Sequence, residues 1–133
     1  MTGERDTYLY TEKMMLRLSK PIFIENSKIP VWLSYISPIS ISAITLGPFV
    51  ISRWVMSDTT KNHETIHWQQ YIDLGILAFP IAYFFYWLIG LIKYRDGVKA
   101  YYQIPFEQEA YNNEENPYYL LMRKRWGWRK LKI

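Results

Sequence analysis

Residues 57–74 read SDTTKNHETIHWQQYIDL and contain neither proline nor glycine. Ser57 and Asp58 carry side-chain oxygens of the kind that cap helix N-termini, so this stretch predicts a helix that begins beside them. His63 and His67 stand four residues apart within it. On a helix this spacing places both imidazoles on one face, where they can bind a single metal ion.

Glu64 follows the first histidine of this HExxH pattern. Zinc lowers the pKa of a bound water to about 7, and a carboxylate beside that water can take up its proton. We therefore predict Zn²⁺ as the cofactor and Glu64 as the general base of a metallohydrolase. The alternative is a pair of histidines that only pack or hydrogen-bond, but an HExxH string is expected by chance on the order of a few times in a thousand chains of this length.

A third metal ligand must be a carboxylate, because the chain has no cysteine and no histidine beyond these two. Residues 105–111 read PFEQEAY, and proline at the start of such a run favours a helix N-terminus. This second helix carries Glu107 and Glu109, and its Ala110 permits close packing against a neighbour. Glutamates on a solvated helix face are common, so the residues alone leave both carboxylates open as candidates.

The segment before the HExxH helix is rich in Ile, Val, Ser and Thr, which is typical of β-strands. Residues 42–46 and 49–55 are separated by Gly47 and Pro48, and glycine supplies the backbone freedom that a tight turn needs. We expect a β-hairpin here, with an exposed edge against which an extended peptide can pair. Further upstream, the mixed pattern over residues 8–24 predicts a short strand or an irregular arm.

Residues 74–92 contain no charged side chain and are long enough to cross a bilayer. A straight span would separate His67 from Glu107 by almost the whole hydrocarbon layer, and residues 93–106 would have to return as irregular backbone, which lipid does not tolerate. The metal hypothesis therefore predicts a kink at Pro80 with re-entry, a shallow position in one leaflet, or packing against the rest of the chain. We expect monotopic or re-entrant membrane association, with a buried core helix as the alternative.

The composition of the chain also favours a membrane surface as a partner. Half of the residues are hydrophobic and 18% are aromatic, more than a small soluble domain needs for its core. The last eleven residues hold six basic side chains and two tryptophans: Arg123, Lys124, Arg125, Trp126, Trp128, Arg129, Lys130 and Lys132. Such a basic aromatic tail favours an anionic membrane surface on the cytoplasmic side over a nucleic acid, with a simply solvated tail as the alternative.

Together these elements predict one mainly helical α+β domain over residues 1–133. Its parts are expected in the following order: an N-terminal arm (1–38), the β-hairpin (39–56), the HExxH helix (57–73), an apolar, membrane-associated helix (74–94), and a Glu-bearing helix with the basic aromatic tail (105–133).

The HExxH helix and the Glu-x-x-Ala run at 107–110 resemble the metal motifs of gluzincins, in particular those of membrane metallopeptidases related to the type I CAAX prenyl proteases. The resemblance implies a minimal zincin-like fold, peptidase activity on a peptide or protein substrate, and Glu107 as the third zinc ligand with Glu109 in reserve. Those families place Asp after the Ala, where this chain has Tyr111. Glu109 or Glu114 would then replace that Asp as the partner of a zinc-bound histidine.

A wider resemblance covers residues 40–125 and connects the chain with small HExxH proteins of bacteria and phages. It is carried by the Thr45-Leu46-Gly47 turn, by Gln69 after the HExxH pattern, by the apolar stretch, and by the run from Phe106 to Tyr111.

Two other function classes stay open. A membrane or virion interaction protein without enzymatic activity would keep the same scaffold. Glu64-x-x-His67 is also half of a carboxylate-bridged iron site, but the second Glu-x-x-His of such sites is missing, because no histidine remains. For a hydrolase, Tyr101, Tyr111 and Arg123 are candidate donors to the oxyanion that forms during the reaction.

Overall fold

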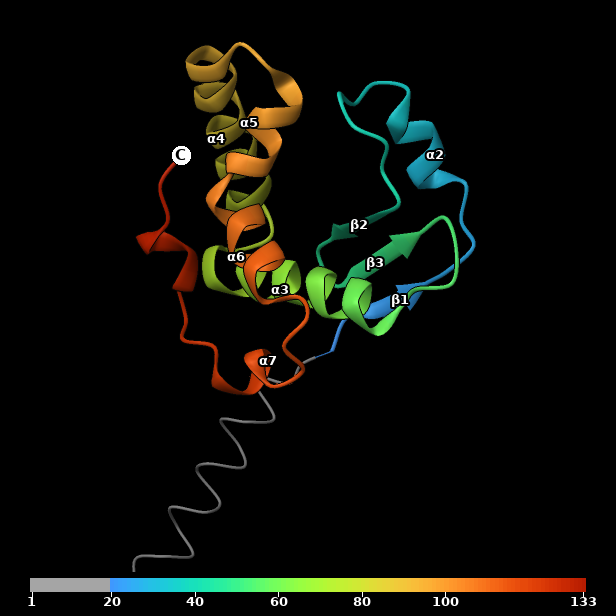
Figure 1. The fold of residues 1–133 in the computed structure, drawn as a ribbon. Helices are drawn as coiled ribbons and strands as arrows, with labels where there is room; N and C mark the ends of the chain where they lie inside the picture. Colours follow the sequence, from blue (N-terminus) through green and yellow to red (C-terminus); the bar gives the residue numbers. More distant parts are fainter. Residues whose placement is uncertain (1–19) are drawn as a thin grey trace, which may run out of the picture.

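The structure, a computed structural model, describes residues 20–133 and shows a small sheet followed by a series of helices (Figure 1). In chain order the elements are β1 (Ile22–Ile24), α2 (Ile29–Ser34), β2 (Ala43–Leu46), β3 (Phe49–Ser52), α3 (Asp58–Leu74), α4 (Ala78–Tyr94), α5 (Gly97–Gln103), α6 (Pro105–Asn113), α7 (Tyr119–Met122) and a 3₁₀-helix, η1 (Gly127–Lys130). The predicted mainly helical α+β class is confirmed. The part of the predicted arm that precedes Lys20 lies outside the described residues.

The sheet has three strands in the order β1-β3-β2. β2 and β3 form the predicted hairpin, with Leu46 paired to Phe49 and Gly47 in the turn at a φ of 58°. The second strand ends at Ser52, earlier than the predicted Val55. β1 joins β3 in parallel, a pairing that local sequence patterns did not predict. β2 remains at one edge of the sheet.

Residues 31–34 belong to the segment 31–56 whose composition predicted strands, but they lie in helix α2. Pro30 lies in the first turn of this helix, where its fixed φ and missing N–H are favourable. Ser34 Oγ donates to Pro30 O and accepts a hydrogen bond from Ile41 N, each at 2.8 Å. This side chain therefore holds the segment between α2 and β2 against the helix.

A sharp bend separates the HExxH helix from the apolar helix. α3 and α4 meet at 109° across residues 75–77, where Gly75 takes a φ of 106°. A kink at Pro80 was one of three predicted alternatives, but Pro80 lies in the first turn of α4 and the bend comes before it. Among the described helices, none is both long and apolar enough to cross a membrane alone, and only the bent pair of α3 and α4 passes that test together.

The chain returns from the end of α4 through helix α5, a helix that sequence reasoning did not predict between residues 94 and 105. Arg95 ends α4 in the left-handed region, and Asp96 caps α5 by accepting hydrogen bonds from two backbone N–H groups. Gly90 lets the two helices approach closely, since a Cβ there would lie 3.1 Å from Ala100. The helical return places α6 in contact with α3 (Figure 1).

An aromatic core joins α3, α4, α6 and the C-terminal segment. Its buried members are Tyr71, Phe79, Ile104, Phe106 and Trp128. Trp128 belongs to the predicted membrane-binding tail, yet its ring lies 4.7 Å from that of Phe106. Arg123 of the same tail is also buried and binds Asp73 at 2.7 Å. Part of the tail therefore belongs to the core. The other basic side chains of the tail are exposed: Lys124, Arg125, Arg129, Lys130 and Lys132.

Candidate metal centre

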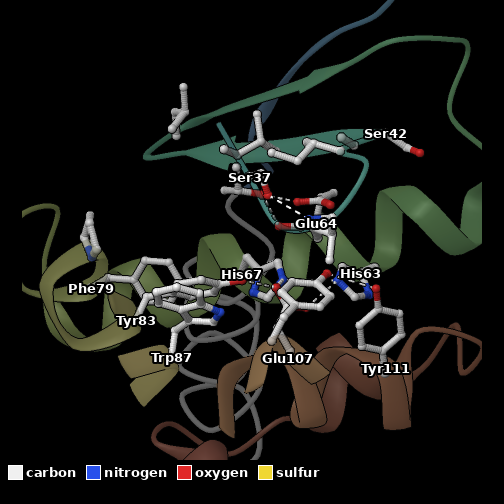
Figure 2. A pocket seen from close by; sticks show the side chains of 18 of the residues that line it. Ser37, Ser42, His63, Glu64, His67, Phe79, Tyr83, Trp87, Glu107 and Tyr111 are labelled. Carbon is white, nitrogen blue, oxygen red and sulfur yellow. Dashed lines mark hydrogen bonds and ion pairs between the residues drawn. The ribbon is translucent and has the colours of Figure 1, made fainter. Parts of the chain in front are cut away.

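Three buried donor atoms meet where α3 faces α6 (Figure 2). His63 Nε2 lies 3.1 Å from His67 Nε2 and 3.2 Å from Glu107 Oε2, and His67 Nε2 lies 3.2 Å from Glu107 Oε1. Tetrahedral ligands at about 2.0 Å from zinc stand about 3.3 Å from one another. The three side chains therefore have the spacing that a small divalent metal ion requires.

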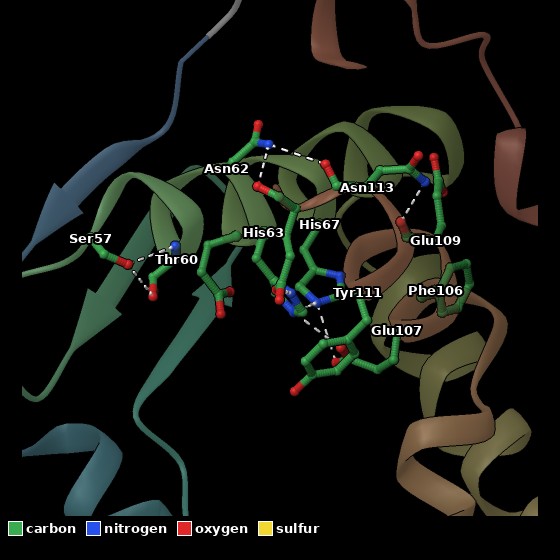
Figure 3. Close-up of polar contacts among 12 residues, drawn as sticks. Ser57, Thr60, Asn62, His63, His67, Phe106, Glu107, Glu109, Tyr111 and Asn113 are labelled. Atoms are coloured by element: carbon green, nitrogen blue, oxygen red, sulfur yellow. Dashed lines mark hydrogen bonds and ion pairs between the residues drawn. The ribbon is translucent and has the colours of Figure 1, made fainter. Parts of the chain in front are cut away.

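The two helices are held together beside the donors by Asn62 of α3. Its Nδ2 donates to the carbonyl oxygens of Asn113 at 3.3 Å and Glu114 at 2.7 Å, at the end of α6 (Figure 3). Such C-terminal carbonyl oxygens have no partner within their own helix. At the N-terminus of α3, just before Asn62, Ser57 caps the helix by accepting a hydrogen bond from Thr60 N at 3.1 Å, as predicted. These contacts fix the position of α6 relative to the histidines.

Each imidazole has a hydrogen-bond partner on its outer nitrogen. His63 Nδ1 lies 2.7 Å from Glu114 Oε2, and His67 Nδ1 lies 2.8 Å from Gln70 Oε1. When both Nδ1 atoms donate to these oxygens, both Nε2 lone pairs are available to a metal ion. Of the two carboxylates considered as replacements for the missing Asp, Glu114 contacts a histidine.

We expect Glu114→Gln to lower zinc affinity by about 10- to 100-fold, because the amide is a weaker acceptor for His63 Nδ1 and removes a negative charge beside the site. The affinity can be measured by competition with a chromophoric chelator. Glu115→Gln is the matched control, because Glu115 is exposed and its substitution changes the net charge by the same amount. Equal affinities for the two variants would contradict this role of Glu114.

The apolar helix contributes Tyr83 to the same cluster. Its hydroxyl donates to Glu107 Oε1 at 2.8 Å, while the other oxygen of Glu107 faces His63. Burial, and then the adjacent Glu107 carboxylate, raise the pKa of Tyr83 well above its ordinary value, so the phenol stays a donor. Sequence reasoning gave Tyr83 no chemical role. The structure shows that it lies one turn after Phe79, which is buried, on the inward face of α4.

The charges of the cluster favour a cation between the donors. Burial lowers the pKa of His67, but the Glu107 carboxylate more than compensates and raises this pKa to about 9. Burial raises the pKa of Glu107, and the positive charge of His67 overcomes that effect, so the net pKa lies well below its ordinary range. The surroundings thus favour an ionised carboxylate next to positive charge, which a divalent metal ion supplies.

Glu64 lies outside this donor set. Its buried carboxylate accepts a hydrogen bond from Thr45 Oγ1 of β2 at 2.6 Å. Glu64 lines the same cleft as both histidines. The hairpin therefore holds this carboxylate beside the cluster without making it one of the three donors.

The cluster opens into a cleft of about 600 Å³ (Figure 2). One wall is the segment 36–46, which includes β2, and the other is the face of α4 that carries Phe79, Tyr83 and Trp87. The side chains of both walls are mostly aliphatic or aromatic. Among the described residues that line the cleft, none is lysine or arginine.

The remaining predicted site residues lie in different places. Glu109, the reserve ligand, points away from the histidines (Figure 3). Its carboxylate binds Arg123 Nε at 2.5 Å. Arg123 is therefore part of a buried ion pair and not a donor at the cleft. Tyr101 and Tyr111 do line the cleft, and their hydroxyls bond to each other at 3.0 Å. The Tyr111 ring also lies 4.5 Å from that of His63.

Comparisons of this chain with protein-family models, with curated proteins and with solved structures give no match. The assignment of the site therefore depends on its geometry and chemistry. What the structure establishes is a buried cluster of His63, His67 and Glu107 that could hold a metal ion.

Proposed function

We propose that this chain is a zinc-dependent metallohydrolase, a peptidase of the gluzincin kind. The observation that carries the proposal is the meeting of His63, His67 and Glu107 beside a cleft: the two Nε2 atoms lie 3.1 Å apart, and each lies 3.2 Å from a different oxygen of the Glu107 carboxylate. Two histidines and one carboxylate are the ligand set of many catalytic zinc sites, whereas structural sites are closed by four protein ligands.

In the proposed reaction, His63, His67 and Glu107 hold the metal and Glu64 moves a proton. Bound zinc would supply a water of lowered pKa and polarise the scissile carbonyl group. Glu64 accepts the proton of the attacking water and passes it to the leaving amine, and its hydrogen bond from Thr45 keeps the carboxylate oriented for this step. Tyr101 and Tyr111, whose hydroxyls bond to each other at the cleft, are the candidate donors to the developing oxyanion.

The walls of the cleft support a peptide as the substrate. β2 lies at the sheet edge and lines the cleft, so its backbone can pair with an extended chain. An anionic group bound away from the metal, such as a terminal carboxylate, would require a cationic side chain, and the described lining residues include no lysine or arginine. We therefore propose internal peptide bonds flanked by apolar side chains as the substrate class.

The experiment that tests this function is metal analysis of purified wild type, His67→Ala, Glu107→Gln and Glu64→Gln, followed by incubation of each with a mixture of peptides. We expect about one zinc per chain in wild type and Glu64→Gln, and little in the two ligand variants, because removal of one of three ligands opens the site. Cleaved bonds are identified by mass spectrometry. Wild type without metal after purification in the absence of chelators would overturn the enzyme assignment and leave a scaffold for interactions. Iron in place of zinc would support the carboxylate-bridged iron alternative.

We also propose monotopic attachment to an anionic membrane surface through the outer face of α4. Its exposed apolar side chains are Ile81, Phe84, Phe85, Ile89 and Ile92. Beyond them, at the end of this helix and the start of α5, come the exposed cations Lys93, Arg95 and Lys99. An apolar face bordered by cations favours the interface of an anionic bilayer, and the positive charge favours its cytoplasmic side.

The double variant Phe85→Asp/Ile89→Asp should lose binding to phosphatidylserine vesicles by at least about 100-fold, because each buried apolar side chain contributes about 1.5–3 kcal/mol. Vesicle co-sedimentation measures this loss. The matched control is Tyr118→Asp/Met122→Asp, which introduces the same charges at exposed apolar residues at the start and end of α7. Vesicle binding that is lost equally in both variants would argue against a specific role of α4.

A further inference from the structure

Gln70 is a buried polar side chain that the proposed reaction does not use. It lies one turn after His67 on α3 and is 0% exposed. Its Oε1 lies 2.8 Å from His67 Nδ1, and its Nε2 donates to Phe106 O at 3.0 Å and to Glu109 Oε2 at 2.9 Å. All the polar atoms of this amide therefore have partners, one of which is a candidate metal ligand.

The partners of the amide determine which way it faces. Both acceptors on the α6 side, a carbonyl oxygen and a carboxylate oxygen, require the NH₂ group. Rotating the amide by 180° would put its oxygen against these two acceptors and lose both hydrogen bonds. Gln70 Oε1 therefore stays directed at His67. An acceptor in that position requires the proton of the neutral His67 ring to be on Nδ1, which leaves the Nε2 lone pair for the metal.

Glu109 is in turn held by the C-terminal segment. Its carboxylate accepts hydrogen bonds from Arg123 Nε at 2.5 Å, from Arg123 Nη2 at 3.3 Å and from the Tyr119 hydroxyl at 2.8 Å. Gly127 allows this close packing, because a Cβ there would lie 3.1 Å from Glu109 Oε1. A chain of hydrogen bonds therefore runs from Arg123 through Glu109 and Gln70 to His67.

We propose that Gln70 is a positioning residue for His67, and that the Glu109–Arg123 pair keeps Gln70 in its orientation. The C-terminal segment thereby contributes to metal affinity although none of its residues belongs to the donor cluster. His63 has a separate partner in Glu114, so the two imidazoles are oriented independently. The inference rests on the proposed function, because it assumes that the cluster binds zinc.

The test combines zinc affinity with the nitrogen NMR spectrum of the histidine rings. The chain has only two histidines, so each ring is assigned by its loss in His63→Asn or His67→Asn. In zinc-loaded wild type we expect His67 to carry its proton on Nδ1 and to bind zinc through Nε2. Gln70→Leu should lower zinc affinity by about 10- to 100-fold and expose the His67 Nδ1 proton to exchange, with His63 unchanged. Arg123→Met should likewise lower zinc affinity and expose the His67 Nδ1 proton to exchange. Arg125→Met should change neither.

The outcomes separate this inference from the proposed function. Zinc bound by wild type, with affinity and His67 signals unaltered in Gln70→Leu, would overturn the inference and leave the metal site intact. If Gln70→Leu does not fold, the spectrum of zinc-loaded wild type tests the inference by itself. Zinc bound to His67 through Nδ1 would overturn the inference. A wild type that binds no zinc would remove the proposed function, and the inference with it.

Discussion

Glu64→Gln is expected to lower the rate of peptide hydrolysis by about 10²- to 10⁴-fold while zinc stays bound, because a glutamine cannot accept a proton. The side chain keeps its size, and its amide oxygen can still accept the hydrogen bond that Thr45 Oγ1 gives to the carboxylate. The loss should therefore be chemical and not structural. Single-turnover cleavage of the best peptide from the wild-type screen measures it.

The control for this prediction is Glu115→Gln, which makes the same substitution at an exposed position outside the cleft. Its cleavage rate should equal that of wild type. A Glu64→Gln variant that binds zinc and cleaves at the wild-type rate would show that another group, or the solvent, takes the proton. A variant that loses zinc would instead mean that Glu64 belongs to the ligand set.

Arg123→Met should lower the free energy of unfolding by about 3–5 kcal/mol, because it leaves buried carboxylates without their counter-charge. Arg123 Nη2 lies 2.7 Å from Asp73 Oδ2 and its Nε lies 2.5 Å from Glu109 Oε1. Burial lowers the pKa of Arg123, but its hydrogen bonds to Glu109 and Asp73 outweigh this and raise it, so the guanidinium stays charged. Urea unfolding with a chelator present measures the change without a contribution from metal binding.

Arg125→Met is the matched control, because Arg125 also faces Asp73 but at 3.7 Å, with its side chain 66% exposed. An exposed ion pair of this kind contributes about 0–1 kcal/mol. The two substitutions remove the same charge from neighbouring positions, so only burial distinguishes them. Similar unfolding midpoints for both variants would contradict the structural role given to Arg123.

Much of the fold could be predicted from local patterns. The Ser57 cap and the absence of Gly and Pro predicted α3, Pro105 predicted the start of α6, and Gly47 predicted the hairpin turn. The parts that sequence reasoning missed depend on other segments. The parallel pairing of β1 with β3 joins segments that are far apart in the chain, and α5 is favoured by its packing on α4 at Gly90.

The candidate site also has a part that local patterns predict and a part that depends on tertiary contacts. The positions of His63, Glu64 and His67 relative to one another follow from helix geometry, because residues four apart share one face. Glu107 and Glu109 are two residues apart, so they project from nearly opposite faces of α6, and only one of them can face the two histidines. Glu107 was favoured by resemblance to gluzincins, and it is the one found in the donor cluster.

The sequence by itself determined that two histidines and a glutamate share one turn of helix, that any third ligand is a carboxylate, and that the helix is preceded by a hairpin. These features depend on dihedral preferences and periodicity within short segments. The tertiary structure alone decided that α4 and α5 return the chain to α3, that Glu107 faces the histidines, and that Tyr83, Gln70, Glu114 and Thr45 surround them. Such contacts depend on how separate helices pack, and packing is a property of the whole chain that no local pattern encodes.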